Sequence, residues 1–219
     1  MKQLSLRLTI GFILCVGFGL LFGYFSSTIE KDTLSSFDSI MITAIQGLEL
    51  PWLTAIMKFF TWIGSGNVVG AITIIVFMLL YFVFKYRHQA FLLVVVIVGT
   101  VIFNHLLKMY FKRERPVIYR ILDAEGYSFP SGHTMMAFSL YVIIAYIAWR
   151  NVETRFGKFL LILFATFMTI MIGTSRIYLG VHFPSDIVGG LMASGFWVTI
   201  AITVYSVYQE QFGNKKPSL

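Results

Sequence analysis

The chain has 219 residues, of which 58% are hydrophobic and only 12% are charged. A soluble domain usually has about 25% charged residues, so this composition excludes an ordinary soluble protein. The net charge of +7 could indicate a nucleic-acid partner, but many of the basic residues lie in short loops beside hydrophobic segments, where membrane topology places them. We therefore expect a polytopic membrane protein that binds no nucleic acid.

Six segments are apolar and long enough for a spanning helix, which needs roughly 20 apolar residues. The apolar run of the first, 8–25, is longer than a signal-peptide core of about 7–15 residues, and we interpret it as a retained helix. The sequence thus predicts one all-α domain over residues 1–219, with a short polar tail at Gly213–Leu219. The predicted spans are 6–26, 66–85, 89–112, 131–150, 158–177 and 186–208.

The segment 27–65 is predicted to form two short helices in the membrane interface, between the first and second spans. Apolar residues recur at helical spacing from Leu34 to Leu48. Pro51 suits the first turn of a second helix that runs to Trp62, before glycines at 64 and 66 break it. The alternative is a seventh, partial span.

Lysine and arginine in alternate loops predict the orientation of the chain. On one side they occur in every loop, so we assign that side to the cytoplasm; on the other they concentrate around 108–120, which places the chemistry on the outer side. The first set is Lys2, Arg7, Lys85, Arg87, Arg150, Arg155, Lys158, Lys215 and Lys216, and the second also includes Lys31, Lys58 and Arg176.

The first candidate motif lies at the end of the third span. Lys108 and Arg115 are seven residues apart, about two helical turns, so they share a face if the helix persists until Pro116 ends it. The arginine fork and the lysine point charge together suit a phosphate group. The alternative is that these charges anchor the helix end among lipid headgroups, a role that we leave open for Lys112 and Arg113 in particular.

The second motif, Pro130-Ser131-Gly132-His133, opens the fourth span. Ser131 can cap the helix, whose free N–H groups then attract an anion. Gly132 lets a ligand approach the backbone closely, and His133 can donate a proton to a leaving oxygen. The alternative is a capped helix with an interfacial histidine.

The third motif runs from Ser175 to Asp186, between the fifth and sixth spans. A nucleophilic histidine needs a neutral, oriented ring, and a carboxylate on its other nitrogen provides both. Asp186 follows His182 by four residues, at the start of a helix that Pro184 can open. The alternative is that Asp186 only complements the helix dipole. Arg176 adds a third cation for a phosphate.

These groups are predicted to gather on one side of the membrane. A charge near lipid costs roughly 2.5–3.5 kcal/mol on insertion scales, so such a collection indicates a function. The sequence has no carboxylate cluster suited to magnesium. Cys15 is the only cysteine, so it forms neither an internal disulfide nor a thiolate metal cluster. We expect no metal and no cofactor.

Three motifs within residues 108–186 together resemble those of the type 2 phosphatidic acid phosphatases: Lys-x6-Arg-Pro, Pro-Ser-Gly-His and Ser-Arg-x5-His-x3-Asp. The six-span layout also matches, so the resemblance covers nearly the whole chain. The resemblance implies that His182 attacks phosphorus to form a phosphohistidine, that Asp186 orients His182, and that His133 protonates the leaving oxygen and helps to activate water. No metal is needed. It also implies a set of phosphate-binding residues: Lys108, Arg115, Ser131, Gly132 and Arg176.

The compact chain is similar to bacterial members that act on phosphatidylglycerol phosphate, undecaprenyl diphosphate or related lipids such as phosphatidic acid. The resemblance thus implies a lipid phosphate as substrate, an outward-facing site in the bacterial cell membrane, and no obligate protein partner. Two alternatives stay open: a phosphotransferase that passes the phosphoryl group to another lipid's hydroxyl, and a non-enzymatic lipid-binding or transport protein.

Overall fold

The computed structural model describes residues 2–30, 35–116 and 120–212, and these ranges contain helices and no strands, which confirms the predicted all-α class. The helices are α1 (Lys2–Glu30), α2 (Ser35–Gln46), α3 (Pro51–Ile63), α4 (Gly66–Met78), the π-helical turn η1 (Leu79–Val83), α5 (Arg87–Phe111), α6 (Gly132–Trp149), α7 (Arg155–Tyr178) and α8 (Pro184–Phe212).

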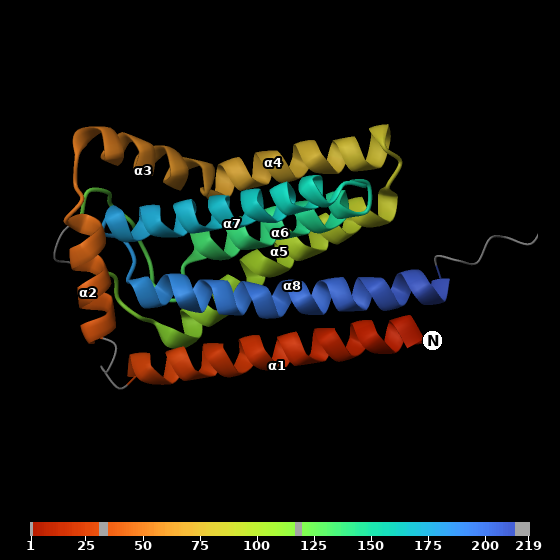
Figure 1. Ribbon diagram of the computed structural model, residues 1–219. Helices are drawn as coiled ribbons and strands as arrows, with labels where there is room; N and C mark the ends of the chain where they lie inside the picture. Colours follow the sequence, from red (N-terminus) through yellow and green to blue (C-terminus); the bar gives the residue numbers. More distant parts are fainter. Residues whose placement is uncertain (1, 31–34, 117–119, 213–219) are drawn as a thin grey trace, which may run out of the picture.

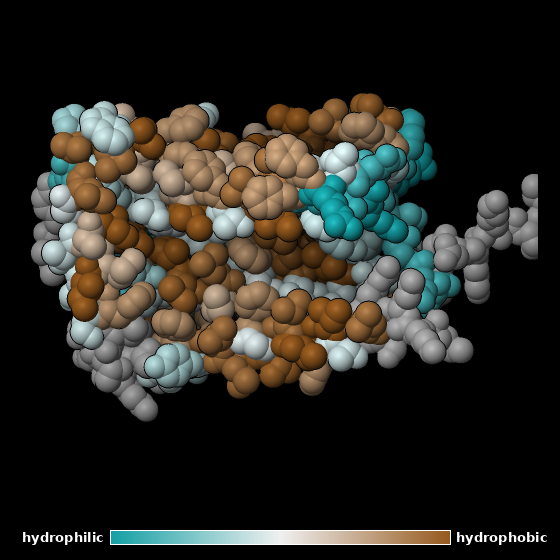
Figure 2. Space-filling model, in the orientation of Figure 1, coloured by the Kyte–Doolittle hydropathy of each residue, from teal (hydrophilic) through white to brown (hydrophobic). Residues whose placement is uncertain are grey.

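Six segments are long and apolar enough to cross a membrane, as predicted, and they run side by side in one bundle (Figure 1). α6 is the most buried of them, since 44% of the residues in its apolar segment are buried inside the protein. α1 packs along α8 at the edge, and only 6% of the residues in its apolar segment are buried. The outward side chains are largely apolar and form the brown band of Figure 2. The spans are Leu8–Ser27, Gly66–Val83, Arg87–Phe111, Gly132–Trp149, Arg155–Tyr178 and Pro184–Gln211.

Two short helices lie between the first and second spans, as predicted, with a bend of 119° between them. α2 lies across the end of the bundle, whereas α3 runs beside α7 and nearly in line with α4 (Figure 1). The side of α3 that faces α7 is held by the Tyr178 hydroxyl, which is 2.8 Å from Oγ1 of Thr54. By length and composition the bent pair also qualifies as a broken seventh span.

The close approach of α5 and α8 brings the ends of distant segments together. A Cβ at Gly99 would overlap the indole ring of Trp197. That ring is fixed because its Nε1 donates to the carbonyl of Val96 at 3.0 Å. The loop after α5 and the start of α8 therefore meet at the same end of the bundle (Figure 1).

The two ends of the bundle differ. The turns that join α4 to α5 and α6 to α7 lie at the end where α1 begins, together with Lys85, Arg87, Arg150, Arg155 and Lys158 (Figure 1). All three predicted motifs reach the opposite end, beside α2. Some predictions concern residues outside the described ranges: the sides of the membrane assigned to Lys31, Lys215 and Lys216, and the polar tail Gly213–Leu219.

Candidate active site

The first motif departs from its predicted geometry. α5 ends at Phe111, and Lys112 follows in the left-handed region with φ 49°, a conformation that stops a helix of L-residues. Arg115 consequently lies in the loop after α5 and shares no helical face with Lys108. The predicted end of this span at residue 112 agrees with the structure, and the condition for a shared face, a helix that persists to Pro116, is not met.

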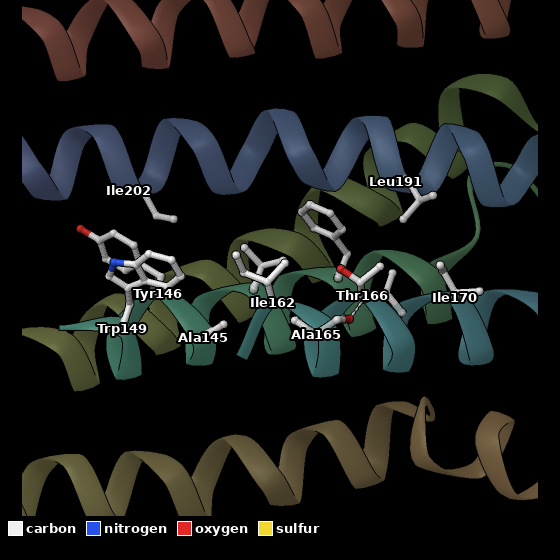
Figure 3. Close-up of a pocket in the computed structure, with 12 residues that line it drawn as sticks. Ala145, Tyr146, Trp149, Ile162, Ala165, Thr166, Ile170, Leu191 and Ile202 are labelled. Carbon is white, nitrogen blue, oxygen red and sulfur yellow. Dashed lines mark hydrogen bonds between the residues drawn. The ribbon is translucent and has the colours of Figure 1, made fainter. Parts of the chain in front are cut away.

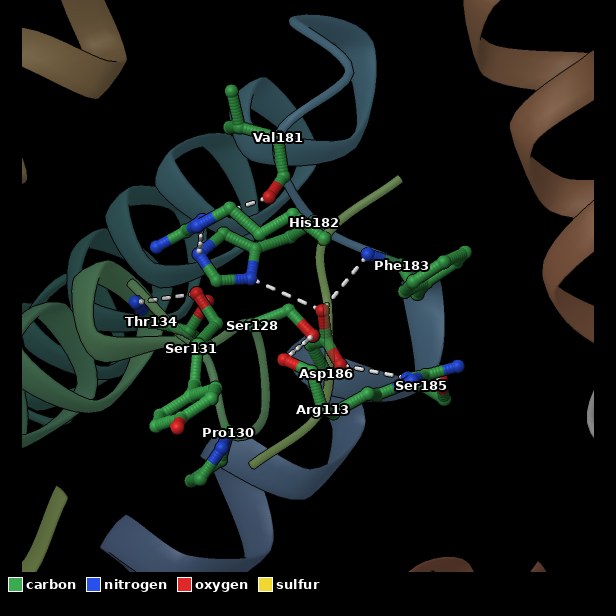
Figure 4. Close-up of polar contacts among 12 residues, drawn as sticks. Arg113, Ser128, Pro130, Ser131, Thr134, Val181, His182, Phe183, Ser185 and Asp186 are labelled. Carbon is green, nitrogen blue, oxygen red and sulfur yellow. Dashed lines mark hydrogen bonds and ion pairs between the residues drawn. The ribbon is translucent and has the colours of Figure 1, made fainter. Parts of the chain in front are cut away.

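The histidine and carboxylate of the third motif are in contact. Nδ1 of His182 is 3.1 Å from Oδ2 of Asp186, and that oxygen also accepts a hydrogen bond from the backbone N–H of Phe183 at 2.9 Å (Figure 4). α8 begins at Pro184, as predicted. A carboxylate accepts only, so Nδ1 carries the proton and Nε2 of a neutral ring keeps its lone pair.

His182 is held in its neutral form. Its side chain is 2% exposed. Burial is the main cause that lowers its pKa, Asp186 raises the pKa, and Arg176 and Arg115 lower it, with a net result of about 4. An imidazole with such a pKa is uncharged at pH 7, as a nucleophile must be.

Arg115 faces the unprotonated nitrogen of His182. Its Nη1 is 3.1 Å from Nε2 of His182 and donates to the carbonyl of Val181 at 2.8 Å. Its Nε donates to the carbonyl of Gly126 at 2.9 Å. The guanidinium is thus fixed by neutral carbonyl groups, next to the atom that would attack.

Ser131 forms the predicted cap of α6. Its Oγ accepts a hydrogen bond from Thr134 N at 3.4 Å, and its own N–H donates to the carbonyl of Asp186 at 3.0 Å. This second bond ties the start of α6 to the start of α8. At Gly132 a Cβ would stand 3.0 Å from Oδ1 of Asn104, so the glycine also permits close packing against α5.

Arg176 carries an unsatisfied donor into the site. The residue is 4% exposed, its Nη1 donates to Oγ1 of Thr61 at 2.6 Å, and its Nε has no hydrogen-bond partner among the described residues. A buried donor without a partner costs about 1–3 kcal/mol, so this atom indicates a missing acceptor such as an anion.

Lys108 and His133 reach the same region without a hydrogen bond to His182. Nζ of Lys108 donates to the carbonyl of Tyr127, and the lysine interacts electrostatically with Arg115, Asp186 and Arg176. His133 interacts electrostatically with His182 and the three cations. Within the described ranges, no hydrogen bond links either residue to His182 or Asp186.

For Arg113, whose role the sequence left open, the structure shows two carboxylate partners. Its Nη1 lies 2.7 Å from Oδ1 of Asp186, and its Nη2 lies 2.9 Å from Oδ2 of Asp38 in α2. Sequence reasoning also missed Asp38, although an acidic residue in an apolar segment marks a functional position. Lys112, by contrast, is exposed.

The cations of the site fall into two groups. In the part of the chain that the structure describes, Arg113 is the arginine that pairs with carboxylates, whereas Lys108, Arg115 and Arg176 donate to carbonyl and hydroxyl oxygens. Their positive charges therefore remain available for an anionic ligand. No three His, Cys, Asp or Glu side chains among the described residues are grouped to hold a metal ion.

A separate apolar cavity of about 700 Å³ lies among α6, α7 and α8 (Figure 3). It runs from Trp149 to Ile170 and Leu191. One helical turn nearer the site, α7 and α8 are in contact, since a Cβ at Gly173 would stand 2.9 Å from Cγ2 of Ile187. The cavity is therefore distinct from the polar site.

Comparison with known proteins finds relatives that are named as lipid phosphatases. The sequence model of the PAP2 superfamily matches residues 89–210. Phosphatidylglycerophosphatase B of Bacillus subtilis (strain 168) is 28% identical over 173 residues, which cover 78% of this chain and 84% of that protein. The putative undecaprenyl-diphosphatase YbjG of Escherichia coli (strain K12) is 35% identical over 88 residues, or 38% of this chain and 40% of the relative.

Two solved structures share the architecture. The transmembrane PAP2-type phosphatidylglycerolphosphate phosphatase from Bacillus subtilis superposes with a TM-score of 0.81 at 26% identity, covering 92% of this chain and 98% of that one. LpxE from Aquifex aeolicus gives a TM-score of 0.58 at 27% identity, covering 74% of this chain and 92% of that one.

The free cations predict that inorganic phosphate binds and stabilises the detergent-solubilised protein. A ligand at 100 times its Kd adds about 2.7 kcal/mol to the free energy of unfolding. Thermal unfolding with increasing phosphate, at constant ionic strength, should show the rise. Arg176→Gln should remove it, whereas Arg150→Gln, at the opposite end of the bundle, should keep it. An equal rise in Arg176→Gln would contradict the assignment.

Proposed function

The chain belongs to the PAP2 superfamily, and from this membership we propose that it hydrolyses a lipid phosphate through a phosphohistidine intermediate on His182. The observation that carries the proposal is the buried pair of His182 Nδ1 and Asp186 Oδ2 at 3.1 Å, which directs Nε2 towards Arg115. The pair lies beside Lys108, Arg115 and Arg176, which have no carboxylate partner among the residues that the structure describes. This combination suits nucleophilic attack on a phosphoryl group better than binding alone.

In the first step, Nε2 of His182 attacks phosphorus, an N–P bond forms and the bond from phosphorus to the lipid oxygen breaks. His133, which enters this step protonated, donates a proton to that oxygen and becomes neutral, so the lipid leaves as an alcohol or, from a diphosphate, as a monophosphate. His182 gains positive charge as the N–P bond forms, and the carboxylate of Asp186 stabilises it.

In the second step, His133 accepts a proton from water, whose oxygen attacks phosphorus. The N–P bond breaks, inorganic phosphate leaves, and both histidines return to their starting states. His133 thus acts first as an acid and then as a base.

Lys108, Arg115 and Arg176 bind the non-bridging oxygens, where charge is spread in the transition state. The N–H groups at the start of α6, beside Ser131 and Gly132, add donors. An incoming phosphate displaces the contact between Arg115 and Nε2 of His182, so that the guanidinium moves from the nucleophile's lone pair to a substrate oxygen.

The substrate class follows from where the site lies. It sits at the end of the spanning helices, where a lipid presents its headgroup while its chains stay in the bilayer. Relatives named phosphatidylglycerophosphatase and undecaprenyl-diphosphatase support phosphatidylglycerol phosphate and undecaprenyl diphosphate as candidates, with phosphatidic acid as a third. We propose that the protein acts in the bacterial cell membrane with its site facing outward.

The proposed nucleophile predicts the effect of His182→Ala. Phosphate release from the three candidate lipids, measured in detergent with a chelator present, should fall at least about 10³-fold because the covalent route is lost. His105→Ala, which changes an exposed histidine of α5, should retain activity. Surviving turnover in His182→Ala would remove the nucleophile assignment. An absolute need for a divalent metal would remove the metal-free mechanism, and phosphate appearing on an added acceptor lipid would favour a phosphotransferase.

The pKa of His182, lowered to about 4 by burial, predicts the acid side of the pH profile. Protonated imidazole cannot attack, so kcat/KM should fall as the pH drops through about 4, well below the ordinary value of about 6.5. The substrate's own ionisation is measured by ³¹P NMR in the same micelles and divided out. A corrected acid limb near 6.5 would show that His182 is not held neutral as described.

The predicted orientation can be tested with single cysteines in a Cys15→Ala background. Glu125 lies in the loop beside the site, and Glu153 lies in the turn between α6 and α7; both residues are exposed and are replaced by cysteine in separate variants. An impermeant maleimide added to intact cells should label Glu125→Cys and leave Glu153→Cys unlabelled until the membrane is opened. The reverse pattern would place the site in the cytoplasm.

A further inference from the structure

We propose that Asp38 and Arg113 are positioning residues that hold Asp186 ionised and correctly oriented for His182. Asp38 lies in α2 and Arg113 in the loop after α5, and within the described ranges neither residue forms a hydrogen bond or ion pair with His182. The inference rests on the proposed function, because it concerns how that site is kept ready for reaction.

The first support is the way the two oxygens of Asp186 are divided. Oδ2 faces the nucleophile and accepts from Nδ1 of His182, whereas Oδ1 accepts from Nη1 of Arg113 at 2.7 Å (Figure 4). The side chain of Asp186 has no exposed surface. A buried carboxylate needs both a countercharge and fixed donors, and Arg113 supplies both on the side away from His182.

The guanidinium of Arg113 is itself held on several sides. Nη2 pairs with Oδ2 of Asp38 at 2.9 Å, and Nη1 also donates to Oγ of Ser185 at 2.7 Å. Its centre lies 4.0 Å above the ring of Phe183, a favourable cation–π distance. Ser128 N donates to the carbonyl of Arg113 at 2.8 Å. Such a planar, multiply bonded group fixes the direction of the bond to Asp186.

Asp38 closes this network from α2. Its Oδ1 accepts from the N–H of Ser185 at 2.9 Å, and its Oδ2 accepts from the hydroxyl of Ser185 at 2.8 Å. The N–H of Ser185 is one of the free donors at the start of α8. Asp38 is only 4% exposed, whereas Ile40, two residues later, is 68% exposed. The helix therefore turns this one carboxylate towards the site.

The charges explain why a second carboxylate is useful. One guanidinium (+1) and two carboxylates (−2) give the cluster a net charge of −1 while His182 is neutral. Because Asp38 takes part of the charge of Arg113, Asp186 keeps negative charge on the side that faces the imidazole. That negative charge stabilises the positive ring that forms when His182 is phosphorylated, and the low local dielectric strengthens the effect.

The test compares Asp38→Asn with Asp123→Asn, the same chemical change at an exposed loop position. Asp38→Asn should lower kcat and the rate of phosphoenzyme formation about 10- to 100-fold, as removal of an orienting partner does at other sites. KM should stay within about 3-fold, because the phosphate-binding cations are unchanged. Asp123→Asn should match the wild type in all three quantities.

A second variant covers failure of the first to fold, which thermal unfolding in detergent detects. Arg113→Lys keeps the positive charge but cannot bind two carboxylates in one plane, so it should also lose kcat with little change in KM. If Asp38→Asn folds and keeps the wild-type kcat, the inference is overturned while the proposed function stands. If Asp38→Asn does not fold, a folded Arg113→Lys with the wild-type kcat overturns the inference in the same way. Absence of turnover and of phosphoenzyme in the wild type overturns the proposed function, and the inference with it.

Discussion

The buried charge of Asp186 is the constraint on which the arrangement of this site depends. Its side chain has no exposed surface, and an unpaired carboxylate in such a place costs several kcal/mol. Three donors offset that cost: the imidazole of His182, the backbone N–H of Phe183 and the guanidinium of Arg113. Each must approach from its own direction, so the turn before α8 and the loop after α5 are fixed relative to each other. The orientation of the nucleophile follows from that arrangement.

Helix packing supplies the frame that makes these contacts possible. The fit of Trp197 against Gly99 holds α8 close to α5, and the bond from Ser131 N to the carbonyl of Asp186 ties α6 to α8. The ends of four spans then meet at one end of the bundle. This place suits a reaction on lipids, because a headgroup can enter the polar site while its chains remain among the apolar surfaces of the helices (Figure 2).

The cations of the site differ in their partners, which are carboxylates for one arginine and neutral oxygens for the others. Arg113 pairs with two carboxylates and so offsets the buried charge of Asp186, the partner of His182. Arg115 and Arg176 bind carbonyl and hydroxyl oxygens instead, and such contacts fix a guanidinium without neutralising it. A phosphate can therefore meet positive charges that no carboxylate in the described residues neutralises, and such charges stabilise the negative charge of a transition state.

Apolar length and motif spacing are local properties of a chain, so the sequence alone predicts the spans and the all-α class that the structure confirms, and it singles out the eight residues of the proposed site. It also indicated the cap at Ser131 and the start of α8 at Pro184. It could not assign Arg113, and it left open whether Lys108 and Arg115 share a helical face, since a left-handed residue at Lys112 leaves no apolar pattern behind. The partners of Arg113 lie 73 and 75 residues away, and Asp38 meets Ser185 across 147 residues. Only the tertiary structure decides such pairs, because a buried charge is satisfied by whichever distant segment the packing brings within hydrogen-bonding distance.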